Sequence, residues 1–151
     1  MQINRDIDFT HYTIQGYAEG QVTVVIPRRH ETPSAGNASG GSGAGEPRRE
    51  TFHRSLIVMP DRLVADWPPQ TLEQLEPGHL EVLLEESLEV VLLGTGARLR
   101  HPDPGITSAL VDHGVGVELM DTGSACRTYN FLMADRRRVA AALMMITANP
   151  A

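Results

Sequence analysis

The pattern of apolar and polar positions near the start of the chain predicts two β-strands joined by a tight turn. Residues 12–17 and 22–26 are rich in β-branched and aromatic side chains, and apolar and polar positions partly alternate within them. Residues 18–20, which end in a glycine, have the composition of a tight turn. The sequence therefore predicts an N-terminal β-hairpin, and strand-like residues resume at 52–59.

Three further apolar segments lie in the second half of the chain. Residues 90–93 form a continuous apolar run, which is typical of a strand covered on both faces in a parallel sheet. Residues 115–120 alternate apolar and other positions, which predicts another strand. Residues 139–146 are uniformly apolar but have high helix propensity, so local patterns leave their conformation open.

Helix signals separate these strand-like segments. Pro77 marks the start of a predicted helix whose leucines recur at helical spacing as far as Leu88. Asp103 followed by a first-turn proline predicts a second helix, which Gly114 ends. The two signals place helices before and after the apolar run at 90–93.

A third helix completes the pattern. Asp121 or Thr122 caps its start, and it ends near Asp135. The order strand, helix, strand, helix is the pattern of right-handed parallel crossovers. The sequence therefore predicts an α/β fold with a largely parallel sheet.

Length and composition indicate a single α/β domain over residues 1–151. A chain of 151 residues with 41% hydrophobic content can bury one core but not two comfortable ones. Residues 33–45 consist of Gly, Ser, Ala, Asn and Pro and offer nothing to bury. We expect a flexible Gly/Ser-rich insertion at about residues 31–50, with an arginine pair on each side of its centre.

Charge and residue usage exclude several functions. The formal net charge is −6, which makes a poor general binder of nucleic acid or anionic membrane. All 13 cationic residues are arginine, so catalytic, Schiff-base and phosphate-binding lysines are excluded. The single Cys126 excludes an intramolecular disulfide and a Cys-rich zinc site, and the six histidines show no close ligand spacing.

Targeting signals are absent from the sequence as given. Residues 1–20 carry acidic side chains and have no basic start followed by an apolar stretch, unlike a secretory signal. No run approaches the roughly eighteen apolar residues of a membrane span. We therefore expect a soluble, cytoplasmic protein.

The bend Gly94-Thr95-Gly96 is the first candidate for chemistry. It follows a buried strand, as a phosphate-cradling turn does, but the dinucleotide fingerprint needs a glycine where this chain has Leu99. The loop before the cap at Asp103 also separates the glycines from the next helix. A simple strand-exit turn is the competing interpretation.

Cys126 is the second candidate, because it lies in the first turns of the third helix. A helix start and the neighbouring Arg127 can both lower a thiol pKa. A nucleophilic thiol also needs a base, and His101 and His113 are the candidates by topology. The competing interpretation is a small buried side chain without reactivity.

Three segments of the second half together resemble a known family. They are residues 90–98, 114–122 and 125–132, and the resemblance extends from about residue 14 to residue 143. The family consists of small domains of unassigned biochemical activity. It includes the mitochondrial respiratory complex I assembly factor 3 type, an adipogenesis-associated vertebrate protein, and many uncharacterised bacterial and archaeal proteins; this chain resembles a bacterial member.

The resemblance implies a three-layer α/β domain around a central mixed, largely parallel sheet, with the N-terminal hairpin region beside it. It makes residues 138–145 a strand that closes the sheet, against their helix propensity. It places the Gly/Ser-rich segment as an insertion in a hairpin that is short in relatives. The turn at Asp135-Arg136 departs from the family's pattern, because many relatives have Glu-Gly there.

The resemblance and the lack of a complete catalytic set support a first hypothesis, a non-catalytic binding or assembly module for an unidentified protein partner. This hypothesis invokes no cofactor, metal, nucleic acid or membrane insertion. The second hypothesis is a small-molecule site or thiol-dependent enzyme at the carboxyl ends of the parallel strands, where ligands commonly bind. The candidate residues are Gly94, Thr95, Gly96, Arg98, Asp121, Thr122, Cys126, Arg127, Thr128, Tyr129 and Asn130. Most of these residues could equally be turn glycines, a helix cap and helix–sheet contacts.

Overall fold

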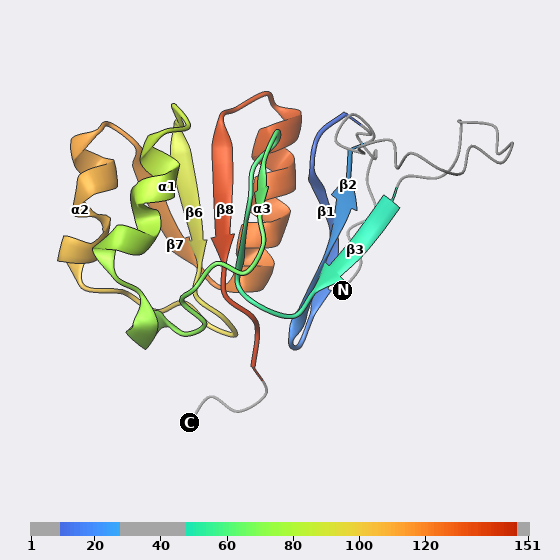
Figure 1. Ribbon diagram of the computed structural model, residues 1–151, viewed down its shortest axis with the longest axis horizontal. Helices are drawn as coiled ribbons and strands as arrows, with labels where there is room; N and C mark the ends of the chain where they lie inside the picture. The colour runs from blue at the N-terminus through green and yellow to red at the C-terminus, as the bar shows by residue number, and fades with distance from the viewer. Residues whose placement is uncertain (1–9, 28–47, 148–151) are drawn as a thin grey trace, which may run out of the picture.

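The computed structural model describes residues 10–27 and 48–147, which form two β-sheets with helices packed against them (Figure 1). The smaller sheet is antiparallel, with strand order β1-β2-β3. Its strands are β1 (Thr13–Ala18), β2 (Gln21–Ile26) and β3 (Arg48–Phe52). The predicted hairpin is confirmed, and Gly20 adopts a positive φ of 72° at its turn.

The predicted insertion at 31–50 lies outside the described residues as far as residue 47. Its last three residues are described, and they belong to β3 instead of the insertion. Arg48, Arg49 and Glu50 pair with the end of β2 in antiparallel register. This pairing provides β2 as a partner for part of their backbone groups, so the strand begins earlier than their polar side chains indicate.

The larger sheet has five strands in the order β5-β4-β8-β6-β7. Their bounds are Leu56–Val58 (β4), Leu63–Val64 (β5), Val90–Gly94 (β6), Gly116–Met120 (β7) and Val139–Leu143 (β8). β6 runs parallel to both β7 and β8, whereas β4 runs antiparallel to β8. The sheet is therefore mixed, as the resemblance implies, and the apolar C-terminal segment forms a strand.

Helical segments connect these strands. They are two 3₁₀ turns, η2 (Leu72–Gln74) and η3 (Pro77–Leu80), and three α-helices, α1 (Glu81–Leu84), α2 (Pro104–Asp112) and α3 (Thr122–Ala134). The helix predicted to run as far as Leu88 ends at Leu84, because Ser87 takes a left-handed φ of 52° and turns the chain toward β6. Asp121 caps α3, and its carboxylate accepts the Ser124 amide at 3.0 Å.

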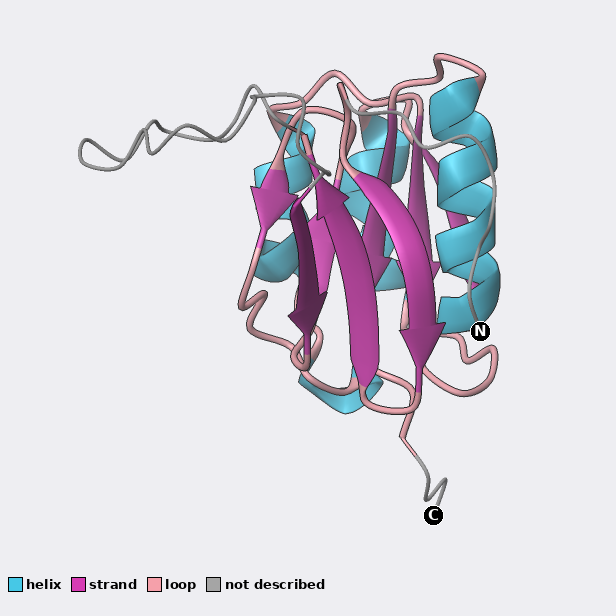
Figure 2. Cartoon of the chain, turned by 90° about the vertical axis from the view of Figure 1, so that its right-hand side faces the viewer, coloured by secondary structure: helices cyan, strands magenta, loops and turns pink. Residues whose placement is uncertain are grey.

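The two faces of the central sheet pack against different layers. Side chains of one parity, such as Leu92 and Ala141, belong to a core shared with α3 and the smaller sheet. Those of the other parity, such as Leu93 and Ala142, belong to a core shared with residues 72–83 and α2. Figures 1 and 2 show these layers on opposite sides of the sheet. The predicted three-layer α/β architecture is confirmed.

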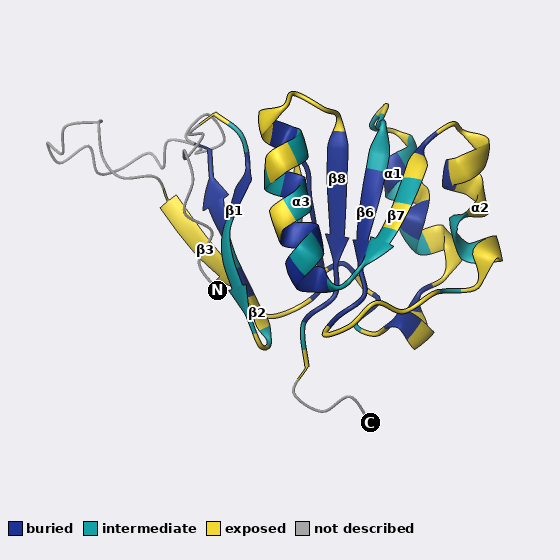
Figure 3. Cartoon of the chain, turned by 180° about the vertical axis from the view of Figure 1, so that it is seen from behind, coloured by how far each residue is buried: buried dark blue, intermediate teal, exposed yellow. Residues whose placement is uncertain are grey.

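Burial explains why β8 is a strand although its residues have high helix propensity. All five residues of β8 are buried, as the dark blue strand in Figure 3 shows. A strand between two apolar layers buries side chains on both faces, which contributes more than the modest propensity difference between alanine and β-branched residues. The small side chains of Ala140, Ala141 and Ala142 also leave room for the layers on either side.

Two adjacent side chains of α3 hold β1 against the helix. The Asn130 amide accepts the Ile14 N–H at 2.9 Å and donates to the Ile14 carbonyl at 2.6 Å. The Tyr129 hydroxyl donates to the Tyr12 carbonyl at 2.7 Å. These bonds fix the position of the smaller sheet on the helix.

Asn130→Ala should destabilise the fold by about 2 kcal/mol, because both backbone groups of Ile14 lose their side-chain partner. Phe131→Ala is the matched control: its ring is 74% exposed on the same helix, so the expected change is below about 0.5 kcal/mol. Urea unfolding of the two variants gives both values. Equal destabilisation would show that Asn130 does not hold β1.

Candidate functional site

The bend at Gly94-Thr95-Gly96 and the start of α3 lie side by side at the carboxyl end of β6. The Thr95 amide donates to the Met120 carbonyl at 2.9 Å. The Thr122 amide donates to the Gly96 carbonyl at 2.9 Å, and the Gly96 amide donates to the Thr122 hydroxyl at 2.8 Å. The two segments therefore bond to each other directly and leave no space for a ligand between them.

Thr122 joins three elements at this point. Its side chain is fully buried, and its hydroxyl also donates to the Met144 carbonyl at 2.6 Å. The Met144 amide in turn donates to the Gly94 carbonyl at 3.0 Å. The hydroxyl thus links the end of β6, the residue after β8 and the first turn of α3.

The structure explains why glycine occupies both positions 94 and 96 of the bend. A Cβ on Gly94 would lie 3.0 Å from the Leu143 side chain and 3.1 Å from Thr122 Cα, closer than ordinary contact. Gly96 has a φ of 101°, which side chains rarely tolerate. Close packing and backbone conformation account for the Gly-Thr-Gly motif.

A groove of about 630 Å³ lies beside the bend, at the carboxyl ends of β6 and β8, and we call it the strand-end groove. Its lining includes three sequence candidates, Thr95, Gly96 and Arg98. The Thr95 hydroxyl shapes the groove wall by donating to the Arg98 carbonyl at 2.7 Å and accepting the Arg100 amide at 3.0 Å. None of the candidates from α3 lines this groove.

The strand-end groove has a mixed polar and cationic wall. Arg98 and Arg100 come from the loop after β6, and the Arg100 guanidinium bonds the Glu73 carboxylate across the groove. This hydrogen bond lowers the pKa of the exposed Glu73. Met144 and Met145 contribute apolar surface. The groove can hold a small ligand with a negative charge, and the carboxylate in its described lining, that of Glu73, is hydrogen-bonded by Arg100 and by the Thr71 side chain.

Cys126 faces the core between α3 and the central sheet. Its side chain is fully buried, and burial raises the pKa of the thiol to about 12, although the Arg127 charge opposes the shift. The thiol therefore stays protonated at neutral pH and is a poor nucleophile. His101 and His113 are exposed, and neither bonds the thiol within the described residues. The structure favours the interpretation of Cys126 as a buried packing residue.

Asp121 and Arg127 belong to a polar cluster over the first turns of α3. The Asp121 carboxylate accepts the Ser124 hydroxyl at 2.6 Å. Burial acts to raise its pKa, but the Ser124 hydrogen bonds and the Arg127 charge together lower it below its ordinary value. The Arg127 guanidinium donates to the Tyr17 hydroxyl and lies 5.7 Å from the ring centroid. The cluster links α3 to β1.

The remaining candidates also lie on α3. Asn130 bonds the backbone of β1, and Tyr129 bonds the carbonyl of Tyr12 just before it, as described above. Thr128 is half-buried and makes no side-chain hydrogen bond within residues 10–27 and 48–147. The candidates therefore separate into the wall of the strand-end groove, one buried thiol, and contacts that assemble the fold.

Sequence reasoning missed the opposite wall of the strand-end groove. Gln70 precedes η2, Glu73 lies within it, and Thr147 follows β8. No local pattern marks them, because tertiary packing alone brings them together. In the described segments, no group of three or more His, Cys, Asp or Glu side chains is placed to hold a metal ion.

Comparison with known proteins places the chain in a family. Residues 42–144 match the family described as "Protein of unknown function (DUF498/DUF598)", and the chain belongs to it. The resemblance inferred from three sequence segments is confirmed. A crystal structure of a protein from Bordetella parapertussis has the same fold, with a TM-score of 0.69 and 31% identity, and the match covers 90% of this chain and 97% of that one.

Curated relatives match about half of this chain. "NADH dehydrogenase [ubiquinone] 1 alpha subcomplex assembly factor 3" of Xenopus tropicalis is 40% identical over 81 residues, which cover 54% of this chain and 43% of that protein. A Francisella tularensis protein named "13 kDa major membrane protein" is 31% identical over 68 residues, covering 45% of this chain and 55% of that one. The chain thus spans about half the length of these relatives. No helix among the described residues is long and apolar enough to cross a membrane.

Thr122→Val should destabilise the fold by about 2 kcal/mol, because it keeps the side-chain volume but leaves the Gly96 N–H and the Met144 carbonyl without the hydroxyl. Thr122→Ser, which keeps the hydroxyl and loses a methyl group, should cost about 1 kcal/mol. Urea unfolding measures both. A larger loss in the serine variant would contradict the importance of the hydroxyl.

Cys126→Ala should remove a fall in the free energy of unfolding that the thiol causes at alkaline pH. The folded pKa of about 12 exceeds the ordinary 9.0, so the unfolded thiol loses its proton first as the pH rises. Its stabilising contribution is complete below pH 9 and is lost toward pH 12, by at most about 1.4 kcal/mol per pH unit. Urea unfolding from about pH 8 to about pH 11 should show this slope in the parent chain and not in the variant. Rapid labelling of the native thiol by iodoacetamide at neutral pH would be inconsistent with this burial.

Proposed function

We propose that the protein is a non-catalytic binding module of the assembly-factor kind, which holds another protein. The observation that carries this proposal is the use of the family-like residues in internal contacts. Thr122, Tyr129 and Asn130 bond backbone groups of neighbouring elements, and Cys126 is buried and protonated. A name shared by several relatives, assembly factor 3, supports the same function.

The chemistry of the strand-end groove also supports binding over catalysis. Glu73, the acidic group in its described lining, is engaged by Arg100. Proton transfer in an active site needs a base with a free lone pair and a pKa near the working pH. The lowered pKa of Glu73 makes it a weak base, and Arg100 bonds one oxygen of its carboxylate.

A second candidate function is the binding of a small anionic molecule in the strand-end groove. Three observations favour it. The volume of about 630 Å³ is typical of ligand sites, the groove lies at the carboxyl ends of parallel strands, and Arg98 and Arg100 supply positive charge.

The proposal also includes the cytoplasmic location that the sequence predicts. Association with a membrane is the alternative, because the Francisella relative is named a membrane protein.

Affinity capture of the tagged full-length chain from a lysate of its source organism tests the proposal. We expect the same protein to be captured reproducibly and to cross-link to the chain. The Cys126→Ala variant should capture the same partner, because the buried thiol takes no part in binding. The matched control is capture with the tag alone. If no protein is captured and native mass spectrometry finds a bound small molecule that Arg98→Gln releases, the second candidate replaces the first.

A further inference from the structure

A second groove, of about 500 Å³, lies at the end of the central sheet opposite the strand-end groove. It is formed where β6 and β8 begin and where α3 ends. Its lining includes Met59, Leu88 and Met133, which supply apolar surface, and four arginines: Arg62, Arg136, Arg137 and Arg138. We call it the arginine groove.

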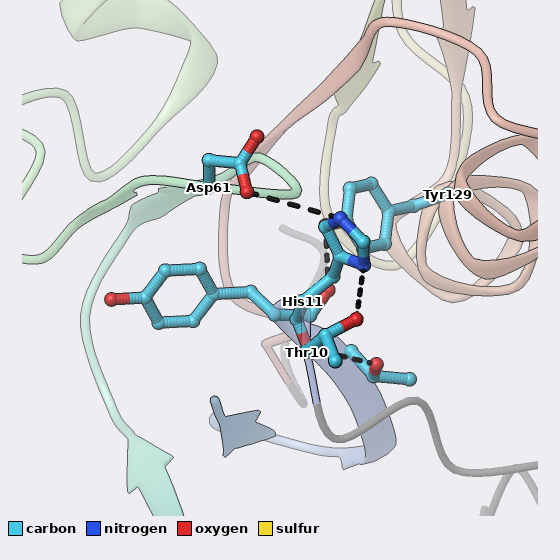
Figure 4. Close-up of polar contacts among 6 residues, drawn as sticks. Thr10, His11, Asp61 and Tyr129 are labelled. Carbon is cyan, nitrogen blue, oxygen red and sulfur yellow. Dashed lines mark hydrogen bonds and ion pairs between the residues drawn. The ribbon is translucent and has the colours of Figure 1, made fainter. Parts of the chain in front are cut away.

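The arginine groove carries more positive than negative charge. Its described lining contains four arginines against two acidic residues, Asp61 and Glu86. Arg62 pairs with Glu86 at 2.5 Å. Figure 4 shows Asp61 beside the His11 imidazole, 3.9 Å away. The local surplus contrasts with the net charge of −6 for the whole chain.

The three consecutive arginines after α3 are unequally engaged. Arg137 and Arg138 share one carboxylate, that of Glu89, at 3.0 and 3.4 Å. The Arg136 guanidinium makes no hydrogen bond or ion pair with any residue that the structure describes, and it is exposed. A bound carboxylate can therefore pair with Arg136. It can also approach Arg137 and Arg138, because the single charge of Glu89 balances only one of their two positive charges.

The backbone at Arg136 adds an independent argument. Its amide donates to the Met133 carbonyl at 3.0 Å, and the Arg137 amide donates to the Leu132 carbonyl at 3.0 Å. This pair of bonds ends a helix with a left-handed residue, a position that glycine fills most easily, and Arg136 has a φ of 59°. The turn keeps the geometry expected of glycine but holds a strained arginine. Arginine at this position bears a strain that glycine would avoid, which supports a role for its side chain in binding.

We propose that the arginine groove binds an acidic segment of a partner protein, with carboxylates against Arg136 and Arg137 and aliphatic side chains against Leu88 and Met133. This inference rests on the proposed binding function and assigns it a surface and a partner chemistry. Arginine favours carboxylates because its planar guanidinium can bond both oxygens. Apolar residues in the same lining favour a polypeptide over a phosphate backbone, which offers no aliphatic side chains.

Fluorescence anisotropy with two labelled peptides tests the proposal, one of alternating glutamate and leucine and one of alternating lysine and leucine. The full-length chain should bind the glutamate peptide, and the affinity should fall as salt rises. Arg136→Gln should weaken binding about fivefold, Arg136→Glu further, and Arg136→Lys least. Arg54→Gln, which removes an exposed arginine outside the groove, is the control and should not change affinity.

Several results would overturn the proposal: equal binding of the lysine peptide, no binding of the glutamate peptide, no effect of Arg136→Glu, or tighter binding of a DNA duplex or of phosphatidylglycerol vesicles.

The variant Arg136→Gly separates an effect on binding from an effect on the fold, because it removes the charge and the backbone strain together. It should melt at or above the parent temperature yet bind as weakly as Arg136→Gln. If lysate capture still yields a partner that Arg136→Glu does not release, the docking surface is wrong and the proposed function stands.

Discussion

Burial of β8 on both faces is the constraint on which the rest of the structure depends. The strand lies between β4 and β6, and its side chains enter two separate cores. Its alanines allow α3 to approach on one side and the 3₁₀ and α1 region on the other. The Thr122 hydroxyl then bonds the backbone just after the strand, which positions α3 along it. The smaller sheet is placed in turn, because α3 holds β1.

The fold follows from the sequence wherever local signals agree. The apolar run at 90–93, the cap at Asp103 and the glycine at 114 each predict the element that the structure contains. Local signals fail at β8, where helix propensity opposes burial, and family resemblance was needed to choose the strand. They also fail after Leu84, because the turn at Ser87 depends on where β6 begins.

The candidate site was less predictable than the fold. Motif residues such as Gly94 and Asn130 are demanded by close packing and by backbone hydrogen bonding, and a sequence pattern cannot distinguish these demands from ligand binding. The two grooves combine residues from three or more distant segments. At Arg136 the sequence alone does not reveal the backbone conformation, and the structure shows a left-handed φ of 59° there.

Asn130 has one more consequence, which concerns association between copies of the chain. β1 is the outer strand of its sheet, and such strands expose backbone groups that invite pairing with another chain. Asn130 occupies both groups of Ile14, the Pro60 carbonyl accepts the Tyr12 amide, and the Ile146 carbonyl accepts the Gly20 amide. The outer margin of β1 is thus bonded at Ile14 and at the residues Tyr12 and Gly20 that flank the strand, which leaves less of this edge open to the addition of a strand from another chain.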